Sequence, residues 1–288
     1  MRAQPALTFA SVDLEHARAV AIRAAETAGA LLTAGAAEQL GIRTKSATGD
    51  VVTNLDLAAE RIIVGQLRAA FPSHRIVAEE SGLLDADDDT WTWLVDPLDG
   101  TNNIAIGLPN FAVGIALCKH AVPVLGIVHD PVRTQTWSAV IGKGTTGPNG
   151  LVRRPRYRPP AHGPVLAWAQ GYAVGRDERT AQALRLVLES RSRRVLQLWA
   201  PLLAWVMLAR GDIDGFVGYR AEMVDLPAGS LIAREAGIAV HDFDGTPFDE
   251  HIGRSTDRNF VAGPPWAIPG LLAMVRAADR VNIGGISR

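Results

Sequence analysis

The sequence lacks the features that mark several classes of protein. Cys118 is the only cysteine among 288 residues, which excludes an intrachain disulfide and a zinc cluster built from several cysteines. No stretch reaches the roughly 18 uninterrupted apolar residues that a membrane-spanning helix needs, and residues 1–10 lack the apolar core of a secretion signal. We therefore expect a cytoplasmic protein without membrane contacts.

An excess of charge of one sign is also missing. Lys and Arg number 29 against 30 Asp and Glu, so the formal net charge is -1. Such a chain has no overall field that attracts nucleic acid or an anionic membrane. Four arginines at positions 153–158 form a local exception, but only Tyr157 supplies an aromatic ring among them. We interpret this segment as a solvated connector and expect no nucleic-acid partner.

The composition that is present is that of a globular protein with a large core, since 48% of the residues are hydrophobic and 20% are charged. Apolar spacing predicts helices and short strands in both halves of the chain. The expected helices are at 13–33, 54–71, 177–190, 201–210, 226–236 and 265–278. The expected strands are at 76–78, 93–95, 111–117, 124–128, 136–141, 165–169, 195–198, 215–217 and 238–241.

A segment rich in Gly, Pro and Arg, residues 142–160, separates two predicted halves of the chain. Residues 1–150 are expected to form an N-terminal α+β half, with helices on an antiparallel or mixed sheet. Residues 151–288 are expected to form a C-terminal α/β half. The predicted fold class is therefore α/β (α+β).

Acidic residues follow two predicted strands and a turn. Glu79 and Asp96 come directly after short apolar runs, and Asp99 lies in the turn Asp-Pro-Leu-Asp-Gly, where the Leu98 carbonyl could face the same point. Carboxylate and carbonyl oxygens are the ligands that Mg²⁺ prefers. The alternative is a plain surface turn. We favour a metal site because the acids follow runs that have the pattern of buried strands.

Phosphate-binding groups are expected beside these acids. Gly100 and Thr101 offer backbone N–H groups, and a short helix that began there would attract an anion to its N-terminus. Thr53 and Asp56 have the spacing of a capping box at the start of the second helix. The predicted metal and phosphate sites are therefore contiguous.

Together these motifs resemble the inositol monophosphatase family, in order and at similar separations, over residues 45 to 237. The resemblance is carried by residues 50–56 (DVVTNLD), 79–82 (EESG), 93–103 (WLVDPLDGTNN), 126–131 (GIVHDP) and 225–229 (DLPAG). It implies a layered α/β/α/β/α sandwich of the sugar-phosphatase superfamily type, and also a homodimer. It further implies dependence on Mg²⁺ and sensitivity to lithium.

The resemblance also implies a role for each matching residue. Two to three Mg²⁺ ions would be held by Glu79, Asp96, the Leu98 carbonyl, Asp99 and Asp225. Glu79 and Thr101 would activate a water for in-line attack on phosphorus. Asp56 would orient Thr101, although simple helix capping is its alternative role. Lys45 would lie near the phosphate or a third metal, and an N-cap role for Asp225 is compatible with ligation.

The substrate side departs from the family pattern. Gly218 stands where the family often has a glutamate that contacts substrate hydroxyls, and Trp199 and Ala200 begin a segment that is bulkier than the usual Gly-Ser-Ala-Ala. Three further residues are candidates for the leaving-group side: Tyr219, Arg220 and Glu222. Arg220 could contact a second phosphate or a carboxylate. A solvated loop is the alternative for this segment.

Three functional hypotheses follow. The first is a magnesium-dependent phosphatase that hydrolyses a small phosphomonoester, such as an inositol monophosphate or a sugar phosphate. The second, motivated by Gly218 and the Trp199 segment, is a phosphatase of 3′-phosphonucleotides or bisphosphates. The third belongs to another class and is a catalytically weak member that binds or regulates.

Overall fold

The computed structural model describes residues 12–36, 41–45, 49, 51–84, 88–152, 163–222, 226–253 and 258–281. The predicted metal ligand Asp225 and the arginine-rich segment 153–158 lie outside these residues. Within the described part of the chain, no helix is both long enough and apolar enough to cross a membrane.

The helices agree closely with those expected from apolar spacing. They are α1 (Leu14–Gly35), α2 (Asn54–Ala70), α3 (Thr101–Ala105), α4 (Arg179–Arg191), α5 (Pro201–Arg210), α6 (Leu226–Glu235) and α7 (Ile268–Ala278). Helix α2 begins as predicted, because Thr53 and Asp56 form a capping box at its N-terminus. Helix α5 has Pro201 in its first turn and ends at Gly211, whose φ of 80° is left-handed.

Two large sheets form the frame. The first has eight strands in the order β10-β9-β8-β7-β6-β5-β3-β4, and the second has five in the order β12-β11-β13-β15-β14. The first comprises β3 (His74–Ala78), β4 (Gly82–Leu84), β5 (Asp88–Asp99), β6 (Ala112–Lys119), β7 (Val122–Asp130), β8 (Gln135–Val140), β9 (Gly144–Gly147) and β10 (Gly150–Leu151). The second comprises β11 (Val165–Gln170), β12 (Arg194–Leu196), β13 (Gly215–Ala221), β14 (Ala239–Asp242) and β15 (Arg258–Gly263).

Strand directions are mixed in both sheets. In the first sheet β3 and β5 are parallel, whereas the other neighbouring pairs are antiparallel. In the second sheet β12, β11 and β13 run parallel, and β15 is antiparallel to both β13 and β14. A separate two-stranded sheet pairs β1 (Arg43–Thr44) with β2 (Val51–Val52). The mixed α/β class predicted from the sequence is confirmed.

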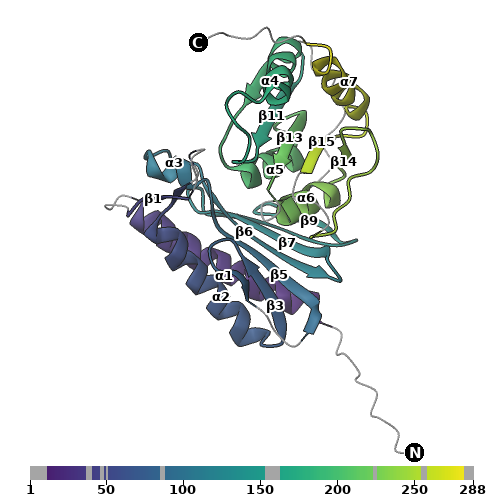
Figure 1. Cartoon of the computed structure of the whole chain (residues 1–288). Coiled ribbons are helices and arrows are strands. Elements are labelled where there is room, and N and C mark those ends of the chain that lie inside the picture. Colours follow the sequence, from purple (N-terminus) through teal and green to yellow (C-terminus); the bar gives the residue numbers. More distant parts are fainter. Residues whose placement is uncertain are drawn as a thin grey trace, which may run out of the picture.

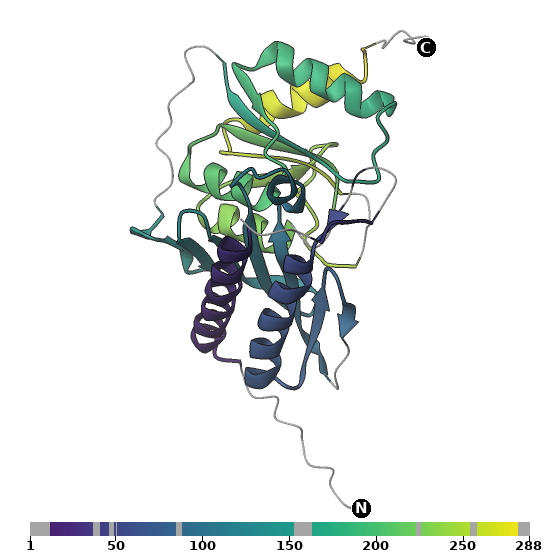
Figure 2. The ribbon, with the colours of Figure 1, turned by 90° about the vertical axis from the view of Figure 1, so that its left-hand side faces the viewer.

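The elements stack in five layers, α/β/α/β/α (Figure 1). Alternate side chains of β5 show how the first sheet is covered: Trp93 and Val95 are buried with α1 and α2, whereas Leu94 is buried with α5 and α6. Helices α5 and α6 also pack against the second sheet, whose outer face is covered by α4 and α7 (Figure 2). The layered arrangement that the family resemblance implied is confirmed.

Several strands differ from the sequence-based expectation, and the short strands β1, β2 and β4 are among those not predicted. Strand β15 was not predicted, because its apolar residues form a run of only three, Phe260 to Ala262, which periodicity cannot classify. The Gly-rich start of the segment 142–160 is not only a loop, since it contributes β9 and β10 to the edge of the first sheet. The two predicted halves also share the central helical layer.

The contact between β7 and α6 yields a stability prediction. A Cβ built on Gly126 would lie 2.7 Å from the backbone oxygen of Ala228, which has little room to move. We expect Gly126→Ala to lower the free energy of unfolding by about 1–3 kcal/mol, as overpacked core substitutions do. Urea denaturation followed by circular dichroism measures this change.

Gly65, on the exposed side of α2, is the matched control, because an added Cβ there meets no atom within 4 Å. Gly65→Ala is expected to leave the free energy of unfolding unchanged or to raise it by up to about 1 kcal/mol. Equal stability of the two variants would contradict the close packing of β7 on α6.

Candidate metal and phosphate site

The parallel pairing of β3 with β5 brings the first two acids together. Ala78 is in register with Val95, and Glu79 N donates to Val95 O at 3.0 Å, so Glu79 and Asp96 leave adjacent strands at the same edge. A register shift between β5 and β6 follows at residues 96–99, and such irregularities re-aim side chains. Asp96 and Asp99 are both buried, with exposed fractions of 2% and 6%.

Backbone donors fix the turn after Asp96. Leu98 N donates to Asp96 Oδ1 at 3.1 Å, and Leu202 N, in the first turn of α5, donates to Asp99 Oδ2 at 2.7 Å. Gly100 has a φ of 103°, and a Cβ there would lie 2.9 Å from Asn110 O, so glycine is required. The short helix α3 begins at Thr101, as the sequence suggested.

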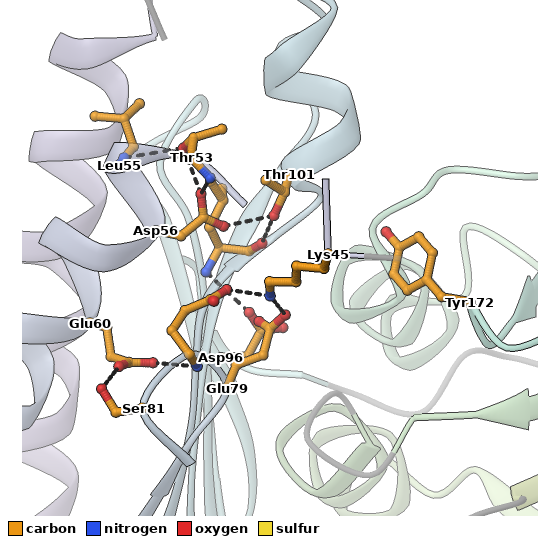
Figure 3. A network of polar contacts seen from close by, with 12 residues as sticks. Lys45, Thr53, Leu55, Asp56, Glu60, Glu79, Ser81, Asp96, Thr101 and Tyr172 are labelled. Carbon is orange, nitrogen blue, oxygen red and sulfur yellow. Dashed lines mark hydrogen bonds and ion pairs between the residues drawn. The ribbon is translucent and has the colours of Figure 1, made fainter. Parts of the chain in front are cut away.

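Asp56 makes both of the contacts that were considered for it. Its Oδ2 accepts from Thr53 N at 2.8 Å and from Thr53 Oγ1 at 2.6 Å, which caps α2. Its Oδ1 lies 2.8 Å from Thr101 Oγ1 (Figure 3). The Thr101 hydroxyl is also 2.9 Å from the Leu98 carbonyl oxygen. The hydroxyl has one proton and donates it to one of these two oxygens at a time. Either bond orients the Thr101 side chain.

Lys45 contacts acids in this structure. Its Nζ lies 2.9 Å from Glu79 Oε1 and 2.5 Å from Glu80 Oε1 (Figure 3). Burial alone would lower the pKa of Lys45, but attraction to Glu79 and Glu80 outweighs it and raises this pKa above its ordinary value. Lys45 is thus a charged partner of the predicted metal ligand.

Burial raises the pKa of several acids of this site, because nearby donors and Lys45 balance only part of their negative charge. It raises the pKa of Glu79 to about 7, against the attraction of Lys45, while repulsion from Glu80 and Asp56 raises it further. Burial also holds the pKa of Asp99 well above its usual range, although Leu202 donates to it. The pKa of Asp56 is raised for the same reason. A divalent cation would stabilise such a cluster of buried carboxylates.

The donor set suits Mg²⁺ in its chemistry. Glu79, Asp96, Leu98 and Asp99 line one cavity and offer hard oxygen atoms. Within the described residues, no group of three or more His, Cys, Asp or Glu side chains forms a ready-made metal cage. The fit therefore rests on the type of donor and on the uncompensated charge.

The cavity has a volume of about 470 Å³ and reaches from these acids to the second sheet. Three of the predicted substrate-side residues line it: Trp199, Ala200 and Glu222. Trp199 is 58% exposed, and its φ of 51° is a left-handed value that glycine adopts more easily. Asn103 Nδ2 helps to hold this backbone by donating to Leu198 O at 2.7 Å.

The other three candidates lie outside the cavity wall. Gly218 faces the ring of Phe260, which a Cβ at Gly218 would overlap. Tyr219 turns away to donate from its hydroxyl to Glu178 Oε1 at 3.2 Å. Arg220 also has a left-handed φ, of 50°, and its N–H donates to Asn259 Oδ1 at 2.8 Å. These contacts keep Gly218, Tyr219 and Arg220 out of the cavity wall.

Glu60 is a site residue that the sequence analysis did not identify. Its exposed fraction is 2%, its Oε2 accepts from Glu80 N at 2.8 Å, and its Oε1 accepts from Ser81 Oγ (Figure 3). These bonds fix the turn that carries Glu79. The signal was available, because Glu60 follows Asp56 by one helical turn on the face that continues with the buried Ile63.

The layered fold and the acid-lined cavity define a protein of the sugar-phosphatase superfamily type. The sequence model of the inositol monophosphatase family matches residues 13–278. The chain therefore belongs to the inositol monophosphatase family, whose members depend on Mg²⁺ in general and act on small phosphate esters.

Relatives and solved structures agree with this assignment. Nus factor SuhB of Pasteurella multocida is 34% identical over 227 residues, 78% of this chain and 85% of that protein. Nus factor SuhB of Escherichia coli K12 is 33% identical, with 89% and 94% covered. The extragenic suppressor protein SuhB of Bartonella henselae has a TM-score of 0.82 at 28% identity, covering 91% and 98%. An IMPase of Thermotoga maritima has a TM-score of 0.78 at 26% identity, covering 93% and 98%.

The buried charge of Asp99 yields a second stability prediction. Asp99→Asn removes the charge, while the amide oxygen can still accept from Leu202 N. At pH 8 with a chelator present, we expect the free energy of unfolding of this variant to exceed that of wild type by about 1 kcal/mol or more. Urea denaturation of both proteins measures the difference.

The sign of the pH effect follows from the raised pKa of Asp99. In wild type, the free energy of unfolding falls as pH rises from the pKa of Asp99 in the unfolded chain to its raised pKa in the folded protein. Below the unfolded value, none of this stability is lost. The advantage of Asp99→Asn should therefore shrink toward pH 5. A variant less stable than wild type at pH 8 would show that the carboxylate is well compensated.

Proposed function

We propose that this protein is a magnesium-dependent phosphatase that hydrolyses a small phosphomonoester, such as an inositol monophosphate or a sugar phosphate. The main support is the register of β3 and β5, which brings Glu79 and Asp96 to one edge of a cavity that Asp99 and Thr101 also line. Membership of the inositol monophosphatase family supports the same activity.

The proposed metal ligands are Glu79, Asp96, the Leu98 carbonyl, Asp99 and Asp225, for two to three Mg²⁺ ions. When bound, Mg²⁺ neutralises charge on the phosphate and makes water a stronger acid. Asp225 joins this set through the family resemblance.

The protein's own groups then position the reactants. Thr101 donates its hydroxyl proton to Asp56 or to the Leu98 carbonyl, so its lone pair can accept from the attacking water. Glu79 is the proposed acceptor of that water's proton. The N–H groups of Gly100 and Thr101 are proposed to bind phosphate oxygens. Lys45 would compensate the acids or approach the phosphate.

A second substrate class is a 3′-phosphonucleotide or a bisphosphate. It is favoured by the cavity wall, where Trp168, Tyr172 and Trp199 provide aromatic surface. Measuring phosphate release from inositol 1-phosphate, a sugar phosphate and a 3′-phosphonucleotide under identical conditions separates the two classes by their kcat/KM.

A catalytically weak binding or regulatory protein is the candidate from another class. Several relatives carry the name Nus factor, and Gly218 has no side chain to contact a substrate hydroxyl. Magnesium binding by calorimetry without turnover of any tested ester would favour this function.

Four further properties accompany the phosphatase proposal: a cytoplasmic location, a homodimer, and the absence of both nucleic-acid and membrane partners. The homodimer rests on the family resemblance, and the other three rest on the composition and the sequence.

Asp96→Asn tests the phosphatase. It removes a proposed metal ligand but keeps the size of the side chain, so we expect kcat for magnesium-dependent phosphate release to fall roughly a hundredfold or more. Asp89→Asn, at the exposed start of β5, is the matched control and should retain the wild-type rate. Unchanged phosphate release by Asp96→Asn would overturn the proposed metal site.

A further inference from the structure

Two arginines lie on the wall of the same cavity, away from the acids. Arg176 is in the loop between β11 and α4, and Arg185 is in α4. No sequence motif indicated either residue, and both are exposed. They come from the outer part of the second half, whereas Glu79, Asp96 and Asp99 come from the edge of the first sheet.

Both guanidinium groups are available to a ligand. Within the described part of the chain, neither Arg176 nor Arg185 makes an ion pair or a side-chain hydrogen bond, and the contact at Arg176 is to its backbone oxygen, from Gln182 Nε2 at 2.8 Å. By contrast, Lys45 is bonded to two acids, and Glu222 Oε1 accepts from Tyr172 N at 3.2 Å. The two arginines are therefore cationic groups of the cavity that have no acceptor for their side chains among the described residues.

The cavity wall mixes aromatic surface with neutral polar groups. Trp168 and Trp199 line it together with Gln170 and Gln197, whereas Gly218 carries no acid and faces Phe260. An uncharged polyol would use these amides but would leave both guanidinium groups without an anion. A leaving group that ends in an anion would instead reach guanidinium groups, whose paired N–H donors match a carboxylate or a phosphate.

We propose that Arg176 and Arg185 form an anion subsite, and that the leaving group of the natural substrate carries a second anionic group, a carboxylate or a phosphate. Glu222 adds one opposing charge to the wall, so two arginines leave an excess of positive charge at this end. The inference rests on the proposed phosphatase function and specifies its substrate class.

Matched ester pairs test the subsite. 3-Phosphoglycerate and glycerol 3-phosphate differ by a carboxylate, and fructose 1,6-bisphosphate and fructose 6-phosphate differ by a phosphate. Each pair is assayed for magnesium-dependent phosphate release and for affinity by calorimetry. The proteins are wild type, Arg176→Gln, Arg185→Gln and the double variant. Arg191→Gln is the control, because it removes the charge of an exposed arginine of α4 that does not line the cavity.

We expect wild type to prefer the ester with the second anionic group in at least one pair, and that pair identifies a carboxylate or a phosphate. Each single substitution should lower kcat/KM for that ester about fivefold, and the double substitution about twentyfold, with the ester that lacks the second group changed less than about twofold. The preference should weaken as ionic strength rises, because both side chains are exposed. Arg191→Gln should behave as wild type.

A preference that is absent in wild type, or that survives in the double variant, would overturn the subsite while leaving the phosphatase proposal intact. Absence of phosphate release from every ester would instead refute the phosphatase, and calorimetry then decides on the subsite alone. Tighter binding of the ester with the second anionic group that disappears in the double variant supports the subsite, and equal binding of both esters of a pair refutes it.

Discussion

The central constraint in this protein is the concentration of carboxylates at one buried strand edge. Asp96 and Asp99 are buried, Glu79 is partly buried and repels Asp99, and Lys45 compensates only part of that charge. Such a group of acids is stable only if other donors hold it or a cation binds it. Much of the surrounding structure supplies those donors.

Backbone N–H groups bond two of these acids, and further hydrogen bonds hold the turns that carry them. Leu98 N donates to Asp96 and Leu202 N, in the first turn of α5, donates to Asp99, while Glu80 N donates to Glu60 of α2. Asn103 Nδ2 and Asn110 Nδ2 both donate to Leu198 O, at 2.7 and 3.0 Å, just before α5. The turn after β5 is thus bonded to the central helical layer. The geometry of the acids therefore depends on how the two sheets pack on α5 and α6.

The parts of the structure that sequence reasoning could predict are those set by local pattern. Helical spacing, the capping box at Thr53 and acids that directly follow apolar runs all depend on neighbouring residues. The family resemblance added Asp225 and the order of layers, which no local pattern indicates. The acid-rich turn could be identified because its residues lie close together in the sequence.

The parts that could not be predicted depend on contacts between distant segments. Arg220 was a candidate for anion contact, but the pairing of β13 with β15 turns its backbone away, and Arg176 and Arg185 line the cavity instead. Strand β15 itself was missed because its apolar run is short. Glu60 was missed because an acid on an apolar face is informative only once the facing turn is known.

Packing also explains why the position of Gly218 has no room for a hydroxyl-binding acid. The ring of Phe260 occupies the space beside Gly218, and it packs against Trp205 and Phe216 with ring centroids 4.9 and 5.1 Å away. A glutamate placed at Gly218 would have to displace the ring of Phe260, so a single substitution there would strain this cluster. The acids of β3 and β5 lie on the first sheet, and α5 connects them to this cluster, because it carries both Trp205 and Leu202, whose N–H donates to Asp99. A change beside Gly218 would therefore act on the leaving-group end directly and on the metal end only through α5.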